Sequence, residues 1–146
     1  SAAMGMVWDK LCLAVKSVGG RPVGWSALDL ARIEAGIPRF GVDIDESHLP
    51  PEAGLDRDGI SYTKGCYLGQ EVMARIQSMG SLRRILRRVE GPVAVGQELR
   101  TPEGKVAGVV RSAAGVVGLA LVAVDLPEGS AFGAVRLGAP ARMPAR

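Results

Sequence analysis

The sequence predicts an α+β chain in which a helical first half is followed by a small antiparallel β-barrel. Apolar residues recur at helical spacing through the first half, whereas the second half consists mainly of short Val-, Leu- and Ala-rich runs. The chain holds 20 glycines and 9 prolines among 146 residues, about a fifth of the total against roughly 12% in an average protein. This excess indicates many turns and short elements, and excludes a helical bundle.

The charge changes sign near the middle of the chain. Residues 1–80 carry eight Lys or Arg and ten Asp or Glu. Residues 81–146 carry ten Lys or Arg and five Asp or Glu. The hydrophobic pattern changes at the same place, so we expect two domains, residues 6–80 and residues 81–146. A basic second domain could bind RNA, but no aromatic cluster accompanies its charges, and a solvated basic surface explains them as well.

Two helices are expected before residue 37. Residues 8–18 place apolar side chains at helical spacing, and a glycine pair ends the pattern. Cys12 lies on the apolar face, so we expect it to pack in a core. Ser26 is the expected N-cap of the next helix, and Gly36 suits the position just beyond its end.

The segment 37–55 is expected to be irregular because it holds four carboxylates and three prolines. A short strand is expected over residues 60–62. Thr63 is the expected N-cap of a third helix, which Gly80 closes.

Five strands are expected in the second half, since Gly- and Pro-containing turns separate its apolar runs. The apolar residues of segment 83–90 also have helical spacing, but the pair Gly91-Pro92 follows this segment at once, so a strand is favoured there. Five short strands in about sixty residues indicate a small barrel or sandwich. The expected strands are 83–90, 97–101, 105–112, 116–124 and 134–143.

The octet Lys64-Gly65-Cys66-Tyr67-Leu68-Gly69-Gln70-Glu71 holds the most informative chemistry. We expect a strand-to-helix turn in which Gly65 allows a close backbone approach and Cys66 lies at or near the first helical position. A helix N-terminus and the Lys64 ammonium would both favour the thiolate. Such a cysteine can be a nucleophile, a redox sensor or a soft metal ligand; the alternative is a small buried apolar residue.

Glu34 is the second unusual residue, because it lies in the last turn of its expected helix. The negative end of the helix dipole disfavours a carboxylate there. Recognition of a ligand rich in N–H donors would explain its position. An ion pair with Arg32 or Arg39 would explain it equally well.

Two stretches resemble one protein family. The octet matches the Lys-Gly-Cys-aromatic-x-Gly-Gln-Glu signature of YgfZ-type folate-binding proteins, which are relatives of the glycine-cleavage T-protein, an aminomethyltransferase. Residues 32–43, Arg-Ile-Glu-Ala-Gly-Ile-Pro-Arg-Phe-Gly-Val-Asp, resemble a second conserved stretch of that family. Because proteins of this superfamily are more than twice as long, the resemblance implies the C-terminal part of a T-protein-like fold followed by its barrel.

The resemblance also implies roles for single residues. Glu34 would bind the pterin of tetrahydrofolate or of a one-carbon derivative, because a carboxylate accepts two parallel N–H donors. Lys64 and Cys66 would form the functional centre of the signature. The residues that would shape or brace it are Gly65, Tyr67, Gln70 and Glu71, although the last two serve equally well as helix-stabilising residues.

The function that the resemblance implies is that of a folate-binding accessory factor for Fe–S cluster assembly or repair in client enzymes, one of them a tRNA-modifying enzyme. We expect such an accessory factor not to be a classical enzyme; if it catalyses a reaction, we expect tetrahydrofolate-dependent one-carbon transfer. The first alternative is a folate-dependent aminomethyl or methyl transferase, and the second is an RNA-binding barrel. Cys66 within the signature favours the accessory factor.

The remaining composition limits other classes of function. Two cysteines and one histidine make neither a disulfide framework nor a self-contained metal site, so we expect no bound metal and a reducing, cytoplasmic location. The longest uncharged run, residues 112–124, has thirteen residues, and a membrane-spanning helix needs about 20. No membrane partner is therefore expected.

Overall fold

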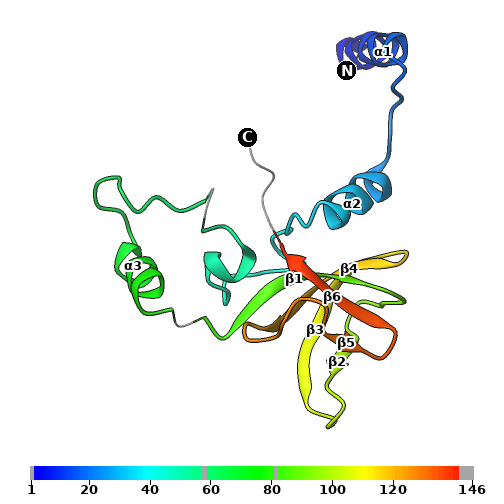
Figure 1. The fold of residues 1–146 in the computed structure, drawn as a ribbon. Coiled ribbons are helices and arrows are strands. Elements are labelled where there is room, and N and C mark those ends of the chain that lie inside the picture. The colour runs from blue at the N-terminus through cyan, green and yellow to red at the C-terminus, as the bar shows by residue number, and fades with distance from the viewer. Residues whose placement is uncertain (1, 57–58, 81, 142–146) are drawn as a thin grey trace.

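The computed structural model describes residues 2–56, 59–80 and 82–141 (Figure 1). Helices occupy the first half of the chain and strands the second. The helices are α1 (Ala2–Ser17), α2 (Trp25–Glu34), the short 3-10 helix η1 (Pro50–Ala53) and α3 (Gln70–Met79).

Six strands form one sheet in the order β2-β3-β4-β1-β6-β5, and every neighbouring pair is antiparallel. Their bounds are β1 (Arg84–Glu90), β2 (Glu98–Arg100), β3 (Val106–Ala114), β4 (Val117–Ala123), β5 (Ala131–Phe132) and β6 (Val135–Pro140).

The sheet curls into a nearly closed barrel. Leu99 on β2 and Phe132 on β5 come from its two edge strands, yet both belong to one buried cluster. That cluster also contains Val89, Val110 and Val122 from the central strands. The predicted α+β chain with a small antiparallel barrel is therefore confirmed.

The outer face of the barrel is also apolar, and α2 covers part of it. Strand β4 alternates, as a strand with two packed faces must: Ala120 and Val122 point into the barrel, whereas Leu119 points outward. Ile33 of α2 is fully buried against Leu119 and Leu86 of β1. This contact places the C-terminal end of α2, and with it Glu34, beside the barrel.

The predicted strands agree with the observed ones to within about two residues where the structure describes them. Strand β1 confirms that residues 83–90 are extended despite their helical spacing. The last predicted strand ends at residue 143, and residues 142–143 lie outside the described part of the chain. Strand β5 was missed because it has only two residues, too few to show an alternating pattern.

Two predicted helix starts were wrong. Helix α2 begins at Trp25, with Gly24 as an extended N-cap and no capping side chain, so Ser26 lies inside the helix. Residues 60–62 form no strand, and α3 begins at Gln70 rather than after Thr63. Gly69 explains the late start, because it is the N-cap at φ 87°, a left-handed conformation that glycine adopts without steric strain. Gly36 and Gly80, both at positive φ, end their helices as predicted.

Helix α1 stands apart from the barrel in Figure 1, and its apolar side chains are exposed. Trp8 is 57% exposed and Leu13 is 68% exposed. Cys12 is half-buried and has no core around it, so its predicted core position was wrong. Among the described residues, none of the helices has the length and apolar character needed to cross a bilayer.

Candidate functional site

The signature octet forms an exposed loop that leads into α3. Residues 64–69 precede the helix, and Gln70 and Glu71 are its first two residues. Met73 is the one buried residue of α3, so the helix presents the loop on the outside of the molecule.

Cys66 is exposed and lies four residues before the first residue of α3. The expectation that it lies at or near the first helical position was therefore wrong. The helix dipole acts within the first turn, so it does not reach this thiol. Gly65 is not needed for a close approach either, because a Cβ added there would meet no atom within 4 Å. The thiol is available to solvent and to a partner.

Contacts within the octet hold the loop in shape. The Lys64 ammonium lies 4.7 Å from the centroid of the Tyr67 ring, a cation–π contact. The Tyr67 backbone N–H donates to Oε1 of Gln70 at 3.2 Å. Burial and the nearby charge of Asp56 raise the pKa of Tyr62, and Tyr67 adds to this effect. Lys64, Tyr67 and Gln70 are thus linked to one another within the loop that carries the exposed thiol.

Within the described part of the chain, no three Cys, His, Asp or Glu side chains lie close enough together to hold a metal ion. Cys66 can therefore act as a nucleophile, as a redox-active thiol or as a single soft ligand. A metal ion or cluster held through it would need its other ligands from outside the described residues.

Glu34 is exposed at the last position of α2, as predicted. Arg88 of β1 donates to its backbone carbonyl at 3.0 Å, which satisfies one free acceptor at the helix end. The alternative explanation for Glu34 was an ion pair with Arg32 or Arg39, but both arginines bind Asp29 instead. Among the described residues no ion pair engages Glu34, so its carboxylate is free to accept donors.

Glu34 and the octet do not meet. Figure 1 shows α2 and α3 on opposite sides of one end of the barrel. The described residues thus present two separate surfaces, a free carboxylate on α2 and an exposed thiol before α3.

A buried ion pair fixes the loop after α2, and the sequence analysis missed its importance. Asp43 is fully buried and accepts from the Arg32 guanidinium and from the Arg39 backbone N–H. Arg32 also donates to Oγ of Ser112 on β3 at 2.6 Å. Helix, loop and barrel are joined through one guanidinium. The signal in the sequence was that Arg32 and Asp43 are the first and last residues of the stretch that resembles the family.

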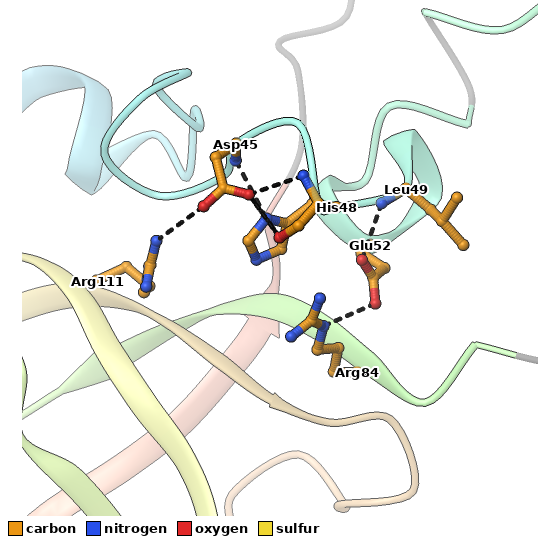
Figure 2. Close-up of polar contacts among 7 residues, drawn as sticks. Asp45, His48, Leu49, Glu52, Arg84 and Arg111 are labelled. Atoms are coloured by element: carbon orange, nitrogen blue, oxygen red, sulfur yellow. Dashed lines mark hydrogen bonds and ion pairs between the residues drawn. The ribbon is translucent and has the colours of Figure 1, made fainter.

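Two further carboxylates of the irregular segment contact the barrel (Figure 2). Glu52 of η1, which is 6% exposed, accepts from Nε of Arg84 at 2.9 Å and from the Leu49 backbone N–H. Asp45 contacts His48 and faces Arg111 of β3 at 3.8 Å. The sequence showed the carboxylates but not their arginine partners, which lie far along the chain.

Comparison with known proteins places this geometry in a family. Residues 69–140 match the family described as CAF17, C-terminal beta-barrel domain. The chain is 37% identical over 86 residues to the tRNA-modifying protein YgfZ of Yersinia enterocolitica, covering 56% of this chain and 25% of the relative. The chain is a YgfZ-type relative of the aminomethyltransferases.

Further relatives support this placement. The mouse mitochondrial iron-sulfur cluster assembly factor IBA57 is 38% identical over 108 residues, covering 67% of this chain and 30% of the relative. The aminomethyltransferase of Caldanaerobacter subterraneus is 32% identical over 80 residues, covering 55% of this chain and 21% of the relative. The YgfZ-type chain thus spans between a fifth and a third of the lengths of these relatives.

A solved structure shows the same fold. The aminomethyltransferase of the glycine cleavage system of Bartonella henselae superimposes with a TM-score of 0.69 at 24% identity, covering 80% of this chain and 38% of that one. The helices and the barrel of the YgfZ-type chain therefore have the arrangement of a T-protein-like fold.

Proposed function

We propose that this YgfZ-type chain belongs to a cytoplasmic, folate-binding accessory factor for Fe–S cluster assembly or repair. The observation that carries the proposal is the exposed thiol of Cys66 within the ordered octet. The relatives named as an iron-sulfur cluster assembly factor and as a tRNA-modifying protein support the same class of function.

In this proposal Cys66 supplies one thiolate ligand to iron or to a cluster in transit, and the client supplies the others. Lys64 and Tyr67 hold the loop so that the thiol remains on the surface. Gln70 braces the loop through the Tyr67 backbone, and Glu71 begins the helix behind it.

Glu34 is the residue that would hold a folate. Its free carboxylate fits the N–H donors of a pterin, since one carboxylate can accept two parallel hydrogen bonds. Tetrahydrofolate would supply a carrier for one-carbon groups when bound. Because Glu34 is exposed, we propose that the remaining walls of the pocket come from a region corresponding to the extra length of the relatives.

A reactivation assay tests the proposal. The chain is mixed under anaerobic conditions with ferrous iron, sulfide, a thiol reductant and the cluster-free form of a [4Fe–4S] hydro-lyase, and recovered activity is followed with time. We expect the wild-type chain to raise the rate, Cys66→Ala to abolish this increase and Cys12→Ala, the matched control, to retain it. Equal rates for the wild-type chain and Cys66→Ala would contradict the role of the thiol.

The alternative of a folate-dependent transferase rests on the aminomethyltransferases among the relatives. Transfer of a one-carbon group to tetrahydrofolate by the chain, retained in Cys66→Ala, would favour that alternative.

A further inference from the structure

A cavity separate from both candidate surfaces lies between the loop 45–48 and the barrel. Its volume is about 590 Å³, within the range of small-molecule sites. Asp45 and His48 form one wall, and the backbone and apolar side chains of β3 and β4 form the floor. Arg83, Arg84 and Arg111 reach it from the barrel. Neither Cys66 nor Glu34 lines this cavity.

The charges around this cavity favour an anion. Three arginines face it, against the single carboxylate of Asp45. Arg84 uses Nε for Glu52, and this bond leaves its other guanidinium nitrogens available as donors. Arg83 is exposed and forms no ion pair within the described ranges.

Arg111 is the least satisfied of the three arginines. Its ion pair with Asp45 is long, with 3.8 Å between Nη2 and Oδ2. Its Nε is buried and has no acceptor among the described residues. The Arg111 side chain as a whole is 33% exposed, so its other guanidinium nitrogens can donate to a ligand.

His48 presents a further polar atom at this wall. Its side chain is only 5% exposed, and Nδ1 lies 2.7 Å from Oδ1 of Asp45. Hydrogen bonds from Ser47 lower the pKa of Asp45 to about 2, and the Asp45 backbone N–H donates to Nδ1 of His48 at 3.1 Å. The other ring nitrogen is left for a ligand, and Figure 2 shows the ring between Arg111 and Arg84.

We propose that this cavity is a binding site for a small polyanion that carries phosphate or carboxylate groups. Arg111 and Arg84 donate to the anion, Arg83 attracts it at the rim, and the imidazole of His48 contributes a hydrogen bond. A small molecule is favoured over a nucleic acid because the arginines converge on a cavity instead of spreading along a surface. The proposal does not depend on the role of Cys66.

Titration calorimetry at constant ionic strength tests this site, with pyrophosphate and citrate as separate probes. We expect saturable binding of at least one probe, and the stronger of the two identifies phosphate or carboxylate as the preferred group. Arg111→Gln should weaken binding by about tenfold or more, as the loss of a charge-assisted hydrogen bond implies. Arg136→Gln on β6 removes the same charge outside the cavity and should change affinity less than twofold.

Arg83→Gln is a second test, because this exposed side chain can change without disturbing the fold; we expect binding weakened by about threefold. Circular dichroism checks that each variant is folded. Absence of saturable binding for both probes would overturn the proposal. Equal losses in Arg111→Gln and Arg136→Gln would show a general charge effect and overturn it too. Tighter binding of an RNA oligonucleotide than of both probes, with its affinity lowered equally by those two substitutions, would also overturn the proposal.

Discussion

Single residues of the signature could be found from the sequence, but their surroundings could not. Spacing and residue type identified Cys66, Lys64 and Glu34, and the structure leaves both the thiol and the Glu34 carboxylate exposed. The position of Cys66 at a helix start was wrong, because Gly69 delays α3. The link from Arg32, the partner of Asp43, to Ser112 on β3 was out of reach of local patterns, because the two residues are 80 positions apart along the chain. The roles of the signature residues stay predictions.

The two cysteines should differ in reactivity. Cys66 is exposed whereas Cys12 is half-buried, so iodoacetamide at neutral pH should modify Cys66 several-fold faster. Peptide mapping by mass spectrometry after short reaction times measures the two rates. Equal rates, or faster labelling of Cys12, would contradict the exposure that the structure shows.

Asp43 should matter for stability more than any surface carboxylate. Asp43→Ala leaves the largely buried Arg32 guanidinium with one carboxylate fewer, and breaking a buried pair costs about 3–5 kcal/mol. We expect Asp43→Ala to lower the free energy of unfolding by about 3 kcal/mol, the lower end of this range, because Asp29 still pairs with Arg32.

Urea denaturation measures the free energy of unfolding for this variant. The control is Glu98→Ala, which removes an exposed pair with Arg100 and should cost about 1 kcal/mol or less. A loss for Asp43→Ala as small as that of the control would show that the buried pair does not hold the loop.

At the scale of elements, the sequence predicted the barrel well because its strands are short apolar runs separated by Gly- and Pro-containing turns. The helical spacing of β1 was overruled correctly by the Gly91 turn that follows it. The two-residue β5 had no pattern to detect. Helix starts failed because neither α2 nor α3 has a capping side chain.

Gly91, in the turn after β1, lies close to the backbone at the start of β6, the strand that pairs with β1. It has φ 127°, and a Cβ there would lie 2.4 Å from the backbone oxygen of Ala134. Gly91→Ala should therefore lower the stability by about 2 kcal/mol or more, through backbone strain and a backbone clash.

Gly133→Ala separates these two causes, since Gly133 also has positive φ but an added Cβ meets no atom within 4 Å. We expect it to cost about 1 kcal/mol. Thermal unfolding followed by circular dichroism ranks the two variants. Equal losses would show that the close approach at Gly91 contributes nothing.

At the scale of the whole molecule, the α+β organisation and its barrel were predictable, and the relation of the two candidate surfaces was not. Local patterns contain no information on how α2 and α3 lie around the barrel (Figure 1). The domain boundary at residues 80–81 stays a prediction. The exposed apolar side chains of α1 were mistaken for a core face, because periodicity indicates an apolar stripe and not what covers it.

Tetrahydrofolate should bind weakly to the YgfZ-type chain alone. Glu34 is exposed and distant from the octet, so a pterin held there would gain few contacts while losing its translational and rotational freedom. We expect a Kd of about 0.1 mM or weaker, and at least tenfold tighter binding by a full-length YgfZ protein. Titration calorimetry compares the two proteins. Equally tight binding by the chain alone would show that its pocket is self-contained.

The most direct test of the central claim relates the state of one thiol to cluster delivery. Samples are alkylated with iodoacetamide to increasing extents, the modified fraction of Cys66 is measured by mass spectrometry, and each sample enters the reactivation assay. We expect the chain-dependent rate to fall in proportion to the modified fraction and to reach the rate without the chain at full modification. A Cys12→Ala sample should follow the same line. A rate unchanged after complete alkylation of Cys66 would contradict the claim that this thiol carries the function.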